Sequence, residues 1–193
     1  MPGITATPNV LTDAGYLFWA PLGSTEPSNT VSGSKFTDNW PVAWLSMGAT
    51  EDGSEFDYNI KVDPITVAEF YDVIAWRTTE RTGSFAFNMA NWALLQLSQA
   101  MNGGTRTIVS GTGATQLNSF LPPAPGAEVR AMIGWEALDN TARLICYQCI
   151  NSGTIKSSFK KAPALATIAC TFNFEIPTSG NPFKFYTAGT ARA

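Results

Sequence analysis

The sequence predicts a mainly β protein: a β-sandwich or partly open barrel of about seven or eight strands with one flanking α-helix. Short apolar or alternating segments recur along the chain between clusters of Gly, Pro, Asn and Ser, which is the pattern of sandwiches and barrels. Convincing helical periodicity occurs in one segment, residues 88–104. No linker or repeat divides the 193 residues, so residues 1–193 are expected to form a single domain.

The first strand is expected at Tyr16–Leu22, after an extended arm formed by residues 1–13. It opens with four large apolar side chains in a row, YLFW. A strand with one face in water alternates apolar and polar residues, so this run predicts that both faces are covered, by the core or by another subunit. A long polar loop follows at Pro27–Asn39, and a second strand is expected at Trp40–Met47.

The clearest alternation in the sequence is EFDYNIKV, residues 55–62, in which every second residue is polar. It predicts a half-buried strand with one polar face. Pro64 is expected to interrupt this strand, and another long strand is expected at Trp76–Asn88, with Phe85, Phe87 and Met89 on one face. Later strands are expected at Thr105–Ser110, Glu128–Leu138, Arg143–Ile150 and Ala166–Ile176, before a tail over residues 177–193.

The predicted helix lies within NMANWALLQLSQAMNGG. Asn88 or Asn91 is expected to cap its start, because an asparagine side chain can accept hydrogen bonds from the first backbone N–H groups. Gly103 and Gly104 are expected to end it, because glycine readily takes the left-handed conformation found after a helix. Apolar residues at four-residue spacing form one stripe: Met89, Ala93, Leu97 and Met101.

Composition indicates that part of the surface does not face water. Charged residues make up 14% of the chain, against roughly 25% in an ordinary soluble domain, so packing against copies of the same chain is expected. The net charge of −3 offers no basic surface for holding nucleic acid. No apolar run has membrane-spanning length, and the start, MPGITATPNV, lacks the pattern of a secretory signal. We therefore expect no membrane insertion, and a role in a cytoplasm or in something assembled there.

No catalytic or cofactor motif can be recognised. The chain has no histidine and lacks the glycine-rich and nucleophile motifs of nucleotide-binding proteins and hydrolases. The acidic stretch EDGSEFD does not have the spacing of a calcium loop, and a solvated turn leading into a strand is the favoured interpretation. We therefore expect neither enzymatic activity nor a bound cofactor.

The three cysteines, Cys146, Cys149 and Cys170, are an odd number, which does not favour a disulfide framework. Cys146 and Cys149 lie three residues apart on an expected strand. Their thiols should therefore point to opposite faces and not share a metal ion. Both are expected to be small buried hydrophobic residues.

Four segments between Asp13 and Gly104 carry a resemblance to a known family. In order, they are DAGYLFWAPLGSTEP, FTDNWPVAWLSMGATEDGSEFDYNI, VDPITVAEFYDVIAWRTTERTGSFAFNMA and the helix end AMNGG. Together they resemble the major tail protein, or tail tube protein, of long-tailed (siphovirus-type) bacteriophages. The resemblance implies a β-sandwich subunit with one flanking helix and, in this chain, no appended C-terminal immunoglobulin-like domain.

The resemblance also implies a virion structural protein of the phage tail, assembled in the host cytoplasm. Subunits of this family close into hexameric rings, which stack into a hollow tube around the tape-measure protein, and the genome later passes through the tube. The implied partners are further copies of the chain, the tape-measure protein, the tail terminator and the distal tail protein. DNA would pass transiently and without specific binding.

Candidate sites follow from the strand pattern and the resemblance together. An acidic channel wall repels phosphates and lets DNA pass without sticking, so the polar strand face is the candidate lumen wall. The arm before Asp13 and the loops Pro27–Asn39 and Gly48–Ser54 are expected to form contacts between rings and to order on assembly. The candidate lumen residues are Glu55, Asp57, Asn59 and Lys61. The candidate contacts between rings or subunits are Tyr16, Phe18, Trp19, Pro27, Phe36, Trp40, Glu51 and Asp52.

Two alternatives stay open. Six tryptophans on a β-rich fold also suit a carbohydrate or cell-wall binding module, which would be a monomer with exposed tryptophans. Trp19, Trp44 and Trp76 lie within apolar runs, however, which favours burial in a core or an interface. Another virion component, such as a distal tail or decoration protein, is the nearer alternative.

Overall fold

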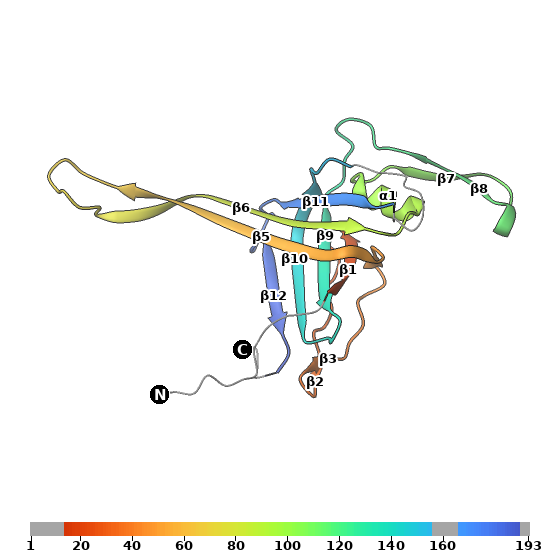
Figure 1. The fold of residues 1–193 in the computed structure, drawn as a ribbon, viewed down its shortest axis with the longest axis horizontal. Helices are drawn as coiled ribbons and strands as arrows, with labels where there is room; N and C mark the ends of the chain where they lie inside the picture. The colour runs from red at the N-terminus through yellow and green to blue at the C-terminus, as the bar shows by residue number, and fades with distance from the viewer. Residues whose placement is uncertain (1–13, 156–165, 190–193) are drawn as a thin grey trace.

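The computed structural model describes residues 14–155 and 166–189, and within these ranges the chain is mainly β with one α-helix (Figure 1). Eight of the described strands form one antiparallel sheet, and two further pairs form separate hairpins. The sheet contains β1 (Gly15–Pro21), β4 (Leu45–Ser46), β5 (Thr50–Ile65), β6 (Ala75–Met89), β9 (Ala131–Ala137), β10 (Ala142–Asn151), β11 (Ile168–Phe174) and β12 (Phe183–Thr187). The hairpins are β2 (Val31–Ser32) with β3 (Lys35–Phe36), and β7 (Thr105–Ser110) with β8 (Leu117–Leu121).

Strand β10 is the centre of the sheet. One of its sides pairs with β9, and the other pairs first with β12, from Ala142 to Cys146, and then with β11, from Cys149 to Asn151. Because β10 changes partner along its length, β11, β6 and β5 turn away and run across β9 and β10 (Figure 1). The end strands β4 and β5 do not pair with each other, so the sheet is curled but does not close into a barrel.

The main core lies between the two parts of the curled sheet. As predicted, Phe85, Phe87 and Met89 lie on one face of β6, and all three are buried. Phe87 stacks on Phe172 of β11, with the ring centroids 5.8 Å apart. The predicted class is confirmed: the described fold is mainly β, open rather than closed, with one helix beside the sheet.

Strand β1 is covered on both faces, as its apolar run predicts, and both covers come from its own chain. Leu17 faces the main core. Phe18 and Ala20 face the opposite side, where Trp40 and Trp44 pack over them. Trp40 stacks on Phe18 with the ring centroids 4.4 Å apart. A second subunit is therefore not required to explain this apolar strand.

The strand predicted at Trp40–Met47 is wrong except at its end, where β4 is two residues long. Instead the chain turns after Pro41, where the backbone N–H of Trp44 donates to the Pro41 carbonyl at 2.8 Å. The indole rings of Trp40 and Trp44 both pack onto the sheet. Gly134 of β9 provides the space, because a β-carbon there would lie 2.5 Å from the Trp40 ring.

Helix α1 (Leu94–Ala100) is shorter than predicted. Neither predicted asparagine caps it: the N-cap is Ala93, without a side-chain hydrogen bond, and Asn88 belongs to β6. The predicted end is close to the observed one. Asn102 takes the left-handed conformation with a φ of 56°, and the Gly103 N–H donates at 2.8 Å to a carbonyl of the last turn.

Several other predictions need correction. Pro64 does not interrupt its strand, because β5 is an edge strand, where proline is tolerated. Residues 177–193 are not only a tail, since β12 lies within them and pairs with β10. The hairpin β2–β3 lies inside the polar loop Pro27–Asn39, and strand β8 was not predicted. The arm predicted for residues 1–13 lies outside the described residues.

Candidate functional site

Strands β5 and β6 form a long hairpin that projects from the body of the molecule (Figure 1). At its base, β6 also pairs with β11, from Ser84 to Met89. Beyond Ser84, among the residues that the structure describes, the two strands pair only with each other. This free part extends from Asp57, opposite Ser84, to Ile65, a distance of roughly 26 Å at the usual rise of a strand.

One face of the hairpin is polar and mildly acidic. It contains the four predicted lumen residues, which are all exposed and lie opposite small or polar residues of β6. Thr171 and Asn173 extend this face onto β11. With Glu80 opposite Lys61 and Asp63 opposite Arg77, the face carries four carboxylates and two cations, a net charge of −2. The residues predicted from the alternation, Glu55, Asp57, Asn59 and Lys61, thus share one exposed face, and their place in a lumen stays a prediction.

The opposite face of the hairpin is largely apolar, with Arg81 opposite Ile60, and only its base is covered. Phe56 packs on Phe174 and Phe183, with ring centroids 5.7 and 5.0 Å apart. Farther out, Ile60 is 50% exposed and Trp76 is 65% exposed. The prediction of a half-buried strand is therefore wrong for the outer half of β5, and Trp76 does not belong to the core.

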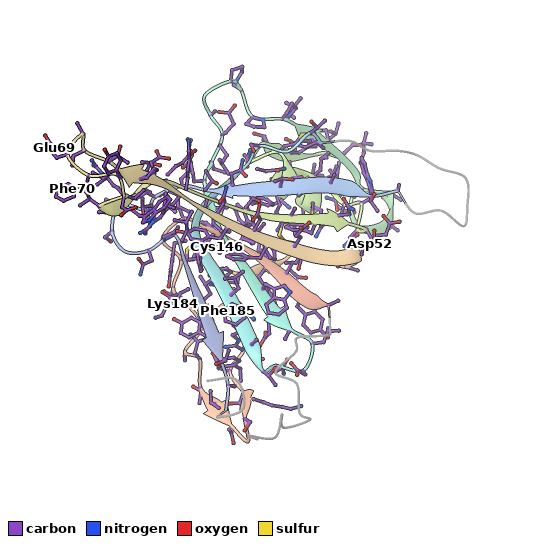
Figure 2. The ribbon with its side chains drawn as sticks, turned by 60° about the vertical axis from the view of Figure 1, so that its left-hand side comes forward. Asp52, Glu69, Phe70, Cys146, Lys184 and Phe185 are labelled. Carbon is purple, nitrogen blue, oxygen red and sulfur yellow. The ribbon has the colours of Figure 1, made fainter. Side chains whose placement is uncertain are left out.

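The tip of the hairpin, residues 66–74, adds further exposed apolar side chains. Phe70 is 65% exposed and Tyr71 is fully exposed. Figure 2 shows Glu69 and Phe70 at the far end, away from the body of the molecule. Monomeric proteins rarely expose large contiguous apolar patches, which makes this surface a candidate interaction site. Its exposed members are Ile60, Val62, Ile65, Val67, Phe70, Tyr71, Val73, Ile74 and Trp76.

The predicted contact residues separate into two groups. Tyr16, Glu51 and Asp52 are exposed and available to another subunit. Pro27 and Phe36 are buried within their own chain, which contradicts their prediction as contact residues, because no side-chain surface is left to touch. The other three, Phe18, Trp19 and Trp40, are half-buried and pack against the chain's own clusters.

The polar loop Pro27–Asn39 is held by Arg143, a residue that no sequence pattern marks. Arg143 is 1% exposed and binds two carboxylates, Asp38 Oδ1 at 2.9 Å and Glu136 Oε1 at 2.8 Å. Asp38 in turn accepts two backbone N–H groups of the loop, each at 3.0 Å. The guanidinium also lies over the Phe36 ring, 4.5 Å from its centroid. All of these contacts lie within a single subunit, and ordering of the loop on assembly stays a prediction.

The cysteines are buried, but they do not point to opposite faces of β10. A β-bulge between Cys146 and Cys149 inserts an extra residue, and both thiols lie in the main core. Burial, together with the neighbouring Cys149 thiol, raises the pKa of Cys146 well above its ordinary value. Burial also raises the pKa of the Cys170 thiol to about 12. Both of these thiols are therefore protonated at neutral pH and are poor nucleophiles.

A groove of about 530 Å³ opens between the start of β5 and strands β9, β10 and β12. Carboxylates of Glu51 and Asp52 and the rings of Trp135 and Phe185 line it, and Figure 2 labels two of these residues, Asp52 and Phe185. Among the described residues, no group of three or more His, Cys, Asp or Glu side chains could hold a metal ion. The groove thus presents acidic and aromatic surface, with the hydroxyl side chains of Thr50 and Ser54 also in its lining.

Comparison with other proteins adds no family assignment: no protein-family model matches the sequence, and no curated protein matches it. In the two described ranges, no helix is long and apolar enough to cross a membrane. The resemblance to tail tube proteins stays a prediction, and the function has to be inferred from the two faces of the β5–β6 hairpin.

Proposed function

We propose that this chain is the structural subunit of a phage tail tube, which assembles into stacked hexameric rings around a channel for the genome. The observation that carries the proposal is the β5–β6 hairpin, which is polar and acidic on one face and apolar and uncovered on the other. A chain that acts alone gains no stability from an uncovered apolar face. A chain that packs against copies of itself buries that face and leaves the polar face in water.

The size of the uncovered surface fits an assembly that depends on concentration. Fully burying one large apolar side chain contributes about 1.5–3 kcal/mol, so Phe70, Tyr71 and Trp76 together would contribute roughly 5–9 kcal/mol. Association costs an estimated 4–15 kcal/mol in lost motion. The free energy of forming a single contact is therefore close to zero. A closed ring, in which each subunit makes two such contacts, is favoured.

The polar face of the hairpin is suited to line a channel through which DNA moves. Its net charge of −2 repels phosphates, and its two cations, Lys61 and Arg77, each lie opposite a carboxylate in the strand register. Glu55 and Asp57 are the two carboxylates nearest the body of the subunit on this face. In the proposed tube they repeat around the channel and keep the passing genome from sticking.

In this role the chain is a virion protein of the tail, assembled in the host cytoplasm, and needs neither catalysis nor a cofactor. Its main partners are further copies of itself. The tape-measure protein, the tail terminator and the distal tail protein are its other proposed partners, by family resemblance. These partners and this location belong to the proposal.

Negative-stain electron microscopy of the purified chain, first dilute and then concentrated, tests the proposal. We expect particles to grow with concentration into rings or hollow tubes of uniform diameter. Compact monomers at every concentration, together with binding to polysaccharide or cell-wall material, would favour the carbohydrate-binding alternative. Single rings that never stack would instead favour a distal tail or decoration protein.

A further inference from the structure

Hairpin β7–β8 is a second projection with an uncovered surface. It forms its own two-stranded sheet, and every residue of β7 is exposed. Leu117 and Leu121 share one face of the hairpin and are 56% and 64% exposed, whereas Ile108, 62% exposed, lies on the other face with Arg106. An isolated two-stranded hairpin is at best marginally stable in water. This hairpin is therefore expected to pack on a partner in the working state of the protein.

The two projecting hairpins lie at opposite ends of the molecule. Figure 1 shows the tip of β5–β6 at one end of the long axis and β7–β8 at the other. They also differ in charge. The tip carries two carboxylates, Glu69 and Asp72, and no basic residue, whereas Arg106 is the only charged residue of the β7–β8 hairpin, residues 105–121. The tip and the β7–β8 hairpin are therefore opposite in net charge.

We propose that the tip of β5–β6 in one copy packs on the β7–β8 hairpin of the next copy. This inference rests on the proposed self-assembly and specifies the contact that carries it. Contact between two identical tips is disfavoured, because it would bring Glu69 and Asp72 of both copies together. Contact between two β7–β8 hairpins would bring two arginines together. Pairing of the tip with the β7–β8 hairpin avoids both of these repulsive contacts.

The apolar area at the tip is close to what such a contact needs. Large aromatic side chains bury about 150–250 Å² each, so the exposed parts of Phe70, Tyr71 and Trp76 offer roughly 400–600 Å². The aliphatic side chains around them, such as Val67 and Ile74, add to this area. A specific interface of standard size buries about 800 Å² on each partner. The tip can therefore supply most of one side of an interface.

A contact between unlike surfaces has a geometric consequence. Each copy uses its tip on one neighbour and keeps its β7–β8 hairpin for another, so the contact repeats from copy to copy. A repeating contact of this kind gives a ring if the rotation closes and a filament if it does not. The acidic end of each copy then always meets the basic end of the next.

Mixing two variants tests this contact. The first carries Phe70→Ser with Tyr71→Ser and lacks the apolar tip. The second carries Leu117→Ser with Leu121→Ser, two exposed side chains on one face of β8, and lacks the apolar receiving surface. Each variant alone is expected to need a concentration at least about tenfold higher than the wild type to assemble. The matched control is Val42→Ser, at a loop residue that is 96% exposed, and it is expected to assemble like the wild type. Thermal unfolding of the dilute chains verifies that all variants fold.

The mixture distinguishes the contact from other modes of assembly. Equal amounts of the two variants should form heterodimers that do not grow, because each keeps one intact surface and only one productive pairing exists. Sedimentation velocity measures the heterodimer. Assembly by both variants at the wild-type concentration, or a wild type that stays monomeric, would overturn the inference. If both variants formed tubes, the proposed contact would be wrong but the proposed function would still be supported. If the variants formed heterodimers and the wild type formed only solid filaments, the contact would be supported and the tail-tube function would be refuted.

A charge exchange tests the complementarity separately. Arg106→Glu should raise the concentration needed for assembly several-fold, because the receiving hairpin then repels the acidic tip. Adding Glu69→Lys to the same chain should restore assembly to nearly the wild-type concentration. Loss with no restoration in the double variant would show that Arg106 does not face the tip and would overturn the proposed pairing.

Discussion

Replacing Arg143 by methionine removes a buried guanidinium and leaves its two carboxylate partners without a counter-charge. The Arg143 side chain is 1% exposed, and those of Asp38 and Glu136 are 15% and 9% exposed. Methionine keeps an unbranched, adaptable side chain in the same space, so the lost charge dominates the effect. The loop Pro27–Asn39 would lose the group that ties it to the sheet.

The expected loss of stability is about 3–5 kcal/mol, because each carboxylate that stays buried has lost its partner and has not regained water. Arg143 joins two such carboxylates and also stacks over Phe36, which places the effect in the upper part of this range. A native domain is stable by about 5–15 kcal/mol in total. The variant should therefore still fold, but with a much smaller free energy of unfolding.

Urea unfolding of the dilute chain, followed by tryptophan fluorescence, measures this loss. At a slope of about 2 kcal/mol per molar urea, the midpoint should fall by roughly 1.5–2.5 M. The matched control is Arg130→Met, since Arg130 pairs with Glu175 where both side chains are well exposed, and its midpoint should hardly change. If Arg143→Met unfolded at the same urea concentration as this control, the buried cluster would not be what orders the loop.

Three further predictions use simpler changes. Gly134→Ala places a β-carbon 2.5 Å from an indole ring and should lower stability by about 1–3 kcal/mol in the same urea assay; an unchanged midpoint would mean that the ring moves aside. Hydrogen bonds from Arg130 lower the pKa of Glu175, so its stabilising effect is present above about pH 4.5 and is lost as the pH falls through the lower folded pKa. Glu175→Gln should therefore remove this part of the stability that the wild type loses in acid. A variant whose stability changes with pH in the same way as the wild type's does would refute this prediction. Glu55→Lys with Asp57→Lys should slow DNA release from assembled virions at unchanged tube length, whereas failure to form tubes would place these residues in an interface.

The strand pattern could be predicted where alternation and burial agree. The apolar positions of β6 mark its core face, because Phe85, Phe87 and Met89 pack on β11. The same alternation in β5 identifies the strand and its polar face. It cannot reveal that the apolar side beyond Tyr58 is uncovered, since a buried face and a face that awaits a partner have the same periodicity.

Other features were missed because they depend on contacts far apart in the sequence. Trp40 and Trp44 form a strand-like pattern, yet the glycine at position 134 gives their rings a place on the sheet. The buried ion cluster joins Asp38 to Arg143, which are more than 100 residues apart in the chain. The bulge between Cys146 and Cys149 reverses the direction of one thiol, and no glycine or proline in this stretch of the sequence indicates a bulge.

Electron cryomicroscopy of particles assembled from the wild-type chain is the most direct test of the central claim. The reconstruction should show stacked rings around an open channel, with the β5 face that carries Glu55 and Asp57 toward the channel. The apolar face of the hairpin should be buried between subunits. A particle without a channel, or one in which this polar face points outward and the apolar face stays in water, would contradict the account.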